Sequence, residues 1–268
     1  GLMLAYRTPE EIPELDHEFP LPLKKLHQIE LTSKCSLRCV YCPSKDIVAG
    51  KYPNRPAMEM TEETFRQALK HVSYFVARGT QTDLNLAGIG ESMMRDDFID
   101  LIRLARTIVP LVVDPSDGQH KKIPFVLATN GLHMTDARAE EMAKMGTFCW
   151  VSLHRPEKAG PAIEIARRHG ILFGTSSDPA TNSDDWAGQV EWHRSQPYAP
   201  ACLWLREGMA MALADGRVTA CCLDAKGSGS IGHVNDEPGT IKTKPYGLCR
   251  GCQQHVRVKG YDQRSAGA

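Results

Sequence analysis

The chain has 268 residues, a length that suits one large α/β domain or one domain with a small addition. Its hydrophobic fraction is 42%, and its 32 basic residues equal its 32 acidic residues. A formal charge of zero gives no support for a nucleic-acid partner. No apolar run approaches the roughly 20 residues that a membrane-spanning helix needs, so we expect no membrane partner.

Strands alternate with helices after a proline-rich lead-in, which covers residues 1–26 and is expected to be extended. We expect strands at 26–31, 83–87, 123–129, 148–153 and 171–176, and helices at 61–78, 97–109, 135–145, 159–169 and 186–195. Strands separated by single helices predict parallel βαβ units. Five or six such units favour a partial, TIM-like (β/α)6 barrel over residues 27–198, because a full eightfold barrel usually needs about 250 residues.

The character of the sequence changes after Pro200, where glycine-rich turns and paired cysteines begin. Asp215-Gly216 stands between the segments MAMAL and RVTA, which is a hairpin pattern. Residues 199–268 are therefore expected to form a small second domain of β-hairpin and helix.

Nine cysteines are an unusual number for a chain of this length. An odd count without an export signal argues against a disulfide framework and favours metal, redox or radical chemistry. We expect a cytoplasmic protein, in which thiols stay reduced.

The first cysteine group directly follows the first expected strand. Cys35, Cys39 and Cys42 have the spacing C-x3-C-x2-C. In a parallel α/β barrel, the loop after a strand lies at the end where active sites form. Three thiolates on one loop can ligate three irons of a cubane cluster, which leaves the fourth iron for a small molecule. Zinc is the alternative, although zinc sites favour four ligands from two spaced pairs.

The segment TSKCSLRCVYCPS resembles the C-x3-C-x-aromatic-C signature of the radical S-adenosylmethionine (SAM) superfamily. That resemblance implies a [4Fe–4S] cluster on Cys35, Cys39 and Cys42, with SAM bound at the open iron. It also implies reductive cleavage of SAM to a 5′-deoxyadenosyl radical, which abstracts a substrate hydrogen atom. The electron would come from a flavodoxin- or ferredoxin-type donor. Tyr41, at the aromatic position, would pack near the adenine.

A second motif follows the second expected strand, in the segment LAGIGES. Gly88, Gly90 and Glu91 resemble the family's Gly-Gly-Glu motif, which binds the methionine amino group of SAM. Glycines let the backbone approach a ligand, and a carboxylate offsets an ammonium. Ser92 stands where the family often has proline. A simple strand-to-helix turn is the alternative.

Polar residues also end the third and fourth expected strands. By the same resemblance, Ser152 would contact the ribose or carboxylate of SAM, and Thr129 and Asn130 would face the substrate. His154 replaces an aspartate of the family, and it could bind substrate or act as an acid–base group. Ordinary strand-end residues, or a solvated histidine, are the alternatives.

The second cysteine group lies in the C-terminal part. Cys202 and Cys221 have the spacing C-x13-G-x4-C with Gly216 between them, and Cys249 and Cys252 form a C-x2-C pair. This pattern resembles the SPASM extension of radical SAM enzymes in its shortened twitch form. The resemblance implies one auxiliary [4Fe–4S] cluster on these four cysteines. A four-cysteine zinc site is the alternative that spacing alone leaves open.

The lead hypothesis for the reaction is a two-electron oxidation (a dehydrogenation) in which the auxiliary cluster accepts an electron. A short barrel with a twitch extension resembles the aminocyclitol dehydrogenase of aminoglycoside biosynthesis. One alternative is epimerisation or isomerisation, with Cys222 as the hydrogen donor. Peptide modification, or a zinc or iron–sulfur binding module without activity, are the others. The substrate is thus a small molecule or a peptide, and Cys149 is expected in the core.

Overall fold

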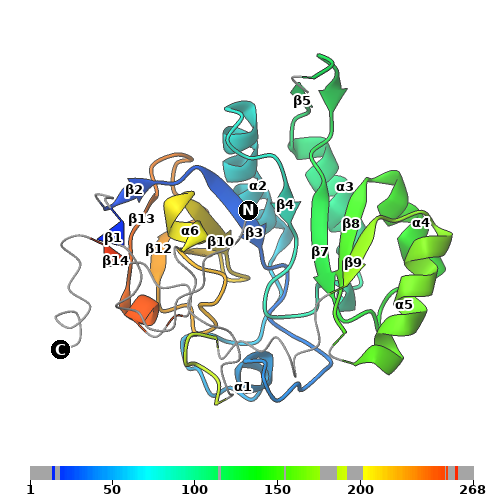
Figure 1. The fold of residues 1–268 in the computed structure, drawn as a ribbon, viewed down its shortest axis with the longest axis horizontal. Coiled ribbons are helices and arrows are strands. Elements are labelled where there is room, and N and C mark those ends of the chain that lie inside the picture. The colour runs from blue at the N-terminus through cyan, green and yellow to red at the C-terminus, as the bar shows by residue number, and fades with distance from the viewer. Residues whose placement is uncertain are drawn as a thin grey trace.

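One mixed sheet organises the chain (Figure 1). The computed structural model describes residues 14–15, 19–113, 116–153, 155–175, 186–191, 202–250, 252 and 257–258. Within them, eight strands follow the order β12-β11-β10-β3-β4-β7-β8-β9. Their bounds are β3 Lys25–Ile29, β4 Leu84–Asn85, β7 Phe125–Thr129, β8 Thr147–Val151, β9 Phe173–Thr175, β10 Met209–Ala212, β11 Arg217–Thr219 and β12 Ser230–His233.

The strands from β10 to β9 are all parallel, whereas β11 and β12 are antiparallel additions at one edge. Six parallel strands with crossover helices confirm the predicted α/β class and the partial TIM-like architecture. Among the described residues, β9 and β12 are the two edges, so the sheet stays open.

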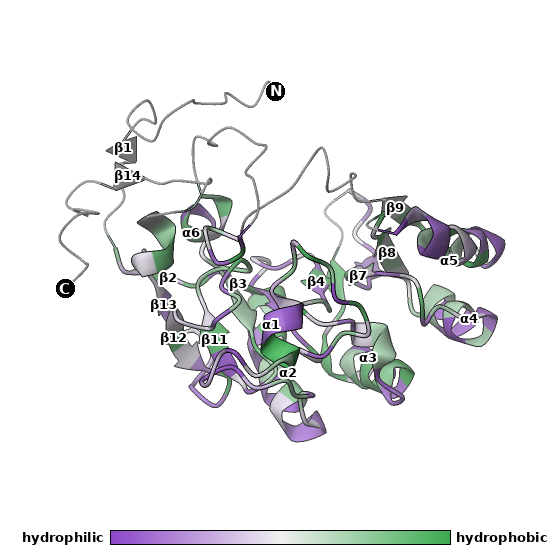
Figure 2. Ribbon diagram, turned by 90° about the horizontal axis from the view of Figure 1, so that it is seen from below, coloured by the Kyte–Doolittle hydropathy of each residue, from purple (hydrophilic) through white to green (hydrophobic). Residues whose placement is uncertain are grey.

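Helices cover one face of this sheet (Figures 1 and 2). They are α2 Glu62–Ala77, α3 Phe98–Ile108, α4 Asp136–Lys144 and α5 Pro156–Arg168. Thr61 begins α2 as predicted, because its side chain accepts a hydrogen bond from the Thr64 N–H at 3.1 Å. Thr135 begins α4 in the same way. α5 starts earlier than expected, because Pro156 is suited to the first turn of a helix.

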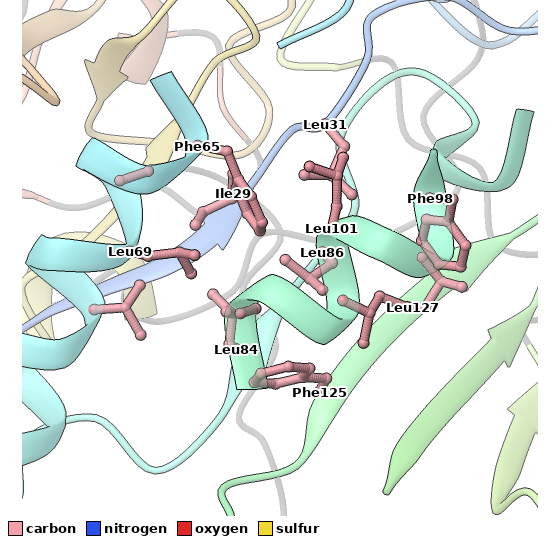
Figure 3. Close-up of a cluster of buried hydrophobic side chains, with 14 of the residues drawn as sticks. Ile29, Leu31, Phe65, Leu69, Leu84, Leu86, Phe98, Leu101, Phe125 and Leu127 are labelled. Atoms are coloured by element: carbon pink, nitrogen blue, oxygen red, sulfur yellow. The ribbon is translucent and has the colours of Figure 1, made fainter. Parts of the chain in front are cut away.

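The main core lies between the strands and α2 and α3 (Figure 3). Core residues two positions apart, such as Leu84 and Leu86 or Phe125 and Leu127, face the helices because successive side chains along a strand point to opposite sides. All ten labelled residues have exposures of 3% or less: Ile29, Leu31, Phe65, Leu69, Leu84, Leu86, Phe98, Leu101, Phe125 and Leu127. Burial of each side chain contributes roughly 1.5–3 kcal/mol to folding.

The predicted hairpin is present and belongs to the main sheet. β10 pairs with β11 around Gly216, whose φ of +88° suits glycine. β10 also pairs in parallel with β3, so the hairpin continues the barrel sheet. The domain boundary at residue 199 stays a prediction.

Strand β10 is buried on both faces. Ala210 and Ala212 pack into the main core, whereas Met209 and Met211 pack into a second apolar cluster that includes Cys202. The alternation of alanine and methionine in MAMAL thus matches a strand that separates two cores.

The helix expected at 186–195 differs from the structure. Trp186 and Ala187 have φ values of 55° and 56°, which a right-handed helix excludes, and residues 186–189 form a turn. The remainder, 192–195, lies outside the described residues.

Several short elements were not expected. They are α1 Ser44–Val48, η2 Ser92–Met94, α6 Leu203–Arg206, η3 Gly247–Arg250, and the pairs β1 Glu14–Leu15 with β14 Arg257–Val258, β2 Leu21–Pro22 with β13 Lys242–Thr243, and β5 Val112–Val113 with β6 His120–Lys121. Part of the expected lead-in is therefore paired with the C-terminal region. No helix in the described ranges has the length and apolarity to cross a bilayer.

A buried histidine predicts how stability depends on pH. Burial lowers the pKa of His71, whose Nε2 lies 3.1 Å from the Val234 carbonyl oxygen. Below the ordinary pKa near 6.5, the unfolded chain therefore binds more protons than the folded protein, and the free energy of unfolding decreases as pH falls. We expect His71→Gln to flatten this decrease between pH 7 and pH 5, as measured by urea unfolding.

His120→Gln is the matched control, because His120 is exposed on β6. It should keep the wild-type slope. Equal slopes for wild type and His71→Gln would contradict the assignment.

Candidate active site

The first cysteine group lies on the loop between β3 and α1, at the carboxyl end of the parallel strands. Met58 and Arg95 hold the start of this loop through hydrogen bonds. The Ser33 N–H and the Thr32 hydroxyl both donate to the Met58 carbonyl, at 2.9 and 3.1 Å. The Arg95 guanidinium donates to the Leu31 carbonyl at 2.8 Å. The loop therefore leaves the sheet from a fixed point.

Cys35, Cys39 and Cys42 are all free thiols and are partly buried. The Cys42 N–H donates to the Cys39 carbonyl at 3.1 Å. The Leu37 N–H and the Asn130 side-chain amide donate to the Cys35 sulfur at 3.4 and 3.8 Å. Burial raises the pKa of Cys35 and raises that of Cys42 to about 12, and nearby thiols add to both shifts. The structure thus brings the predicted three thiols together.

The three thiols of this loop are the kind of ligand that an iron–sulfur cluster takes. In a cubane each cysteine binds a different iron, so the sulfurs need not meet around one point. Three thiols on one loop therefore fit the cluster.

The segment LAGIGES packs directly on the cysteine loop through Gly90. A Cβ at position 90 would lie 2.2 Å from the Thr32 carbonyl oxygen and 2.5 Å from that of Lys34. The Glu91 N–H donates to the Lys34 carbonyl at 2.8 Å. A Cβ at Gly88 would lie 2.3 Å from Cγ of Glu30. Both glycines therefore permit close approach within the protein itself.

Glu91 is buried at the junction of the second and third strand ends, with an exposure of 3%. Its carboxylate accepts hydrogen bonds from the Thr129 hydroxyl at 2.9 Å, the Asn130 N–H at 2.7 Å and the Met93 N–H at 3.2 Å. Burial raises the pKa of Glu91 despite these donors. A cationic ligand group beside this carboxylate would offset its burial.

Tyr41 lies against the thiols of its own loop. Its hydroxyl interacts with Cys39, and burial raises its pKa, while the Arg155 guanidinium opposes that rise. Tyr41 is therefore near the segment that follows β8, as well as near the cysteines.

The end of β8 joins the site through the backbone. The Ser152 N–H donates to the Thr129 carbonyl at 2.8 Å. His154 lies outside the described residues, so its predicted role stays a prediction. Ser152, Thr129 and Asn130 thus share one edge of the sheet with Glu91.

An aromatic residue that the sequence reasoning missed lies on the face away from the helices. Trp150 is 46% exposed although it lies within β8. Ala128 and Gly174 are its register partners on either side, and Phe148 packs against it edge-on with ring centroids 5.3 Å apart. Trp150 alternates along β8 with the buried core residues Cys149 and Val151, so it faces the interior side of the open barrel.

The second cysteine group surrounds one small cavity at the amino end of β10. Cys202 precedes α6, Cys221 follows β11, and Cys249 lies in η3. The cavity is lined by Cys202, Leu205, Ala220, Cys221, Tyr246, Leu248, Cys249 and Cys252. Burial raises the pKa of Cys202 to about 12 and that of Cys249 to about 11. Four cysteines around one apolar cavity fit the ligand set of a fully ligated cluster.

The remaining two cysteines lie elsewhere. Cys222 interacts with Cys221 and packs against the apolar cluster of β10. Cys149 is fully buried in β8, which confirms its predicted place in the core.

Three buried charges and one partly buried arginine support the site, and the sequence reasoning missed all of them. The buried ones are Glu30, Arg55 and Arg95, and Arg138 is partly buried. Arg138 donates to the Met93 carbonyl and, at 3.0 Å, to the Arg95 carbonyl. The detectable signal was Glu30, a charge within an apolar strand immediately before the cysteine loop.

The fold and site together define an α/β enzyme that presents three thiols and a buried carboxylate at the carboxyl ends of parallel strands. The profile of the radical SAM superfamily matches residues 29–171. The chain belongs to the radical SAM superfamily. Membership makes it an enzyme and implies a [4Fe–4S] cluster and SAM, which decides against the binding-module alternative.

Two solved proteins share the fold. BtrN in complex with AdoMet and 2-DOIA has 16% identity and a TM-score of 0.56, over 82% of this chain and 80% of that chain. A histidine-tagged form of anSMEcpe with bound AdoMet has 14% identity and a TM-score of 0.53, over 85% of this chain and 83% of that chain. A further anSMEcpe structure holds AdoMet and the Cp18Cys peptide, with 13% identity and a TM-score of 0.50 over 79% and 77% of the two chains.

The tight contact at Gly90 predicts the effect of a single methyl group. Gly90→Ala places Cβ against two carbonyl oxygens and should lower the free energy of unfolding by roughly 1–3 kcal/mol. We also expect lower iron incorporation, because the cysteine loop must move. Urea unfolding and iron content after anaerobic reconstitution measure both effects.

Gly160→Ala is the control, because Gly160 lies in α5 with open space around it. It should leave iron content unchanged and raise stability by up to about 1 kcal/mol. A Gly90→Ala protein as stable and as rich in iron as wild type would contradict the packing argument.

Proposed function

We propose that this protein is a radical SAM dehydrogenase that oxidises its substrate by two electrons. The observation that carries the proposal is the presence of two separate cysteine sites, one on the loop after β3 and one around a small cavity. Cys35 lies near the carboxylate of Glu91, with Cys39 and Cys42 on the same loop, and a second set of four thiols lines its own cavity.

The proposed SAM site uses residues from four strand ends. Cys35, Cys39 and Cys42 would hold the [4Fe–4S] cluster, which when bound supplies the electron that cleaves SAM and yields the 5′-deoxyadenosyl radical. Glu91 would bind the methionine ammonium, because its buried carboxylate gains from a cationic partner. Gly88 would shape this cradle.

Other residues of the site would orient the nucleoside and the substrate. Tyr41 would pack near the adenine and Ser152 would contact the ribose or carboxylate. Thr129 and Asn130 hold Glu91 and Cys35, so they would fix the distance between the ammonium site and the thiols. His154 remains a candidate acid–base or substrate-binding group.

The second site would complete the oxidation. Cys202, Cys221, Cys249 and Cys252 would hold an auxiliary [4Fe–4S] cluster, which when bound supplies an acceptor for one electron. The net change removes two hydrogens from an H–C–O–H or H–C–N–H group. One leaves carbon as a hydrogen atom, and the other leaves the heteroatom as a proton with one electron transferred, giving C=O or C=N.

The substrate is proposed to be a small molecule or a peptide, since similar folds were solved with 2-DOIA and with a peptide. A flavodoxin- or ferredoxin-type protein is the proposed electron donor. Epimerisation through Cys222 and peptide modification remain outcomes that the product must distinguish.

Two sets of cysteine variants test the proposal. We expect anaerobically reconstituted wild type to hold about eight irons. Replacement of Cys35, Cys39 and Cys42 by Ala should remove about half of this iron and all formation of 5′-deoxyadenosine. Replacement of Cys202 and Cys249 by Ala should also lower the iron content but preserve SAM cleavage. Iron assay and chromatography of 5′-deoxyadenosine measure both.

Cys149→Ala, at a buried thiol outside both sites, should keep full iron and SAM cleavage. SAM cleavage by the triple variant would overturn the proposal. With substrate, a product lighter by two hydrogens supports dehydrogenation. An unchanged mass with deuterium uptake from heavy water would establish epimerisation instead.

The exposed side chain of Trp150 predicts where the substrate binds. Trp150 lies two residues before Ser152, between the small residues Ala128 and Gly174 of the neighbouring strands. A tryptophan half exposed inside a barrel provides a flat apolar surface for a ligand. We expect Trp150→Ala to lower kcat/KM for substrate by tenfold or more, while cleavage of SAM without substrate stays near wild type.

Leu172→Ala is the control, because Leu172 is 75% exposed just before the amino end of β9, away from the carboxyl strand ends that form the site. It should leave kcat/KM unchanged. If Trp150→Ala also leaves kcat/KM unchanged, Trp150 does not contact the substrate.

A further inference from the structure

We infer that Glu30, paired with Arg55, is a positioning residue that sets the SAM-binding loop against the C-terminal hairpin. This inference rests on the proposed function, because it concerns the loop that would bind the methionine ammonium. Neither residue belongs to the cysteine sites or to the Gly-Gly-Glu segment.

The Glu30 carboxylate connects three separate segments. Its Oε2 accepts a hydrogen bond from the Ile89 N–H at 3.1 Å. Its Oε1 accepts from the Ala214 N–H at 3.3 Å and from the Arg55 guanidinium at 2.5 Å. Ile89 lies inside the segment LAGIGES, and Ala214 lies at the turn between β10 and β11. One side chain therefore bonds both loops.

Because Glu30 and Arg55 are buried, water cannot replace the hydrogen bonds that they make. Glu30 and Arg55 both have an exposure of 0%. A buried charge is costly unless it is paired and hydrogen-bonded, so the carboxylate has a strong preference for this one arrangement. Gly88 leaves room for the Glu30 side chain, since a Cβ there would lie 2.3 Å from Cγ of Glu30. The distance between Glu30 and the segment LAGIGES is thus set by the contact at Gly88 as well as by the hydrogen bond from the Ile89 N–H.

The Ile89 contact continues into the proposed cluster site. Ile89 packs with Ile47 of α1 and with Ala225 of the loop after Cys221, and Cys42 packs against this group. Glu91, two residues after Ile89, donates from its N–H to the cysteine loop. A displaced Ile89 would therefore move the Glu91 carboxylate relative to the thiols.

The test variant is Glu30→Gln, which keeps size but replaces one acceptor oxygen by an NH2 group. That NH2 would face an N–H donor, so at least one of the three hydrogen bonds is lost. We expect the SAM dissociation constant and the KM for SAM to rise by tenfold or more, while kcat at saturating SAM changes far less. In cluster-free protein, the Ile89 and Ala214 amides should exchange hydrogen faster.

Glu59→Gln is the matched control, because Glu59 is an exposed glutamate that pairs with Lys34 at the edge of the cysteine loop. It should keep wild-type SAM affinity and amide exchange. Wild-type SAM affinity in Glu30→Gln, with unchanged exchange at Ile89, would overturn the inference.

Arg55 variants keep the test decisive if Glu30→Gln does not fold. Arg55→Lys retains the cation and should bind SAM close to wild type, whereas Arg55→Met leaves the carboxylate unpaired and should weaken binding. Wild-type affinity in Arg55→Met would also overturn the inference. Failure of wild type itself to bind or cleave SAM would contradict the proposed function instead.

Discussion

The site depends on a direct backbone contact between the cysteine loop and the segment LAGIGES. Gly90 lies against the carbonyl oxygens of Thr32 and Lys34, where any Cβ would collide with backbone. Because backbone cannot swing aside as a flexible side chain does, the cysteine loop and the following loop have one relative position. The placement of Glu91 beside the thiols, and of Asn130 beside Cys35, follows from that position.

The buried side chains of Arg95 and Glu30 hold the two loops in this contact. Arg95 donates to the carbonyls of Leu31 and Met60, and Glu30 accepts from the two loops above it. Each of these groups would be costly to bury alone, so each tolerates few alternative arrangements. Buried ion pairs add little to the free energy of unfolding. Because they tolerate few arrangements, they nevertheless determine the positions of the groups that they contact. The site is therefore positioned by electrostatics and the sheet by apolar packing.

The sequence predicted what depends on local pattern. Strand alternation, threonine N-caps, the hairpin glycine and the cysteine spacing all act over a few residues. Glu30 and Arg55 are far apart in the chain, and no local pattern marks their pairing. The glycines of LAGIGES were assigned to ligand approach, yet their nearest neighbours are Glu30 and the cysteine loop. The helix expected from Trp186 failed because left-handed residues begin that segment.

The two cysteine sites lie at opposite ends of one pair of strands. The first follows the carboxyl end of β3, and the second surrounds the amino end of β10, whose Met209 pairs with Lys25 at the start of β3. Five residues of strand place about 17 Å between these ends. In the proposed dehydrogenation, the electron would pass from the substrate near the first site toward the second. Trp150 lies on β8, three strands from β3 in the same sheet, and its 46% exposure offers the proposed substrate an apolar surface.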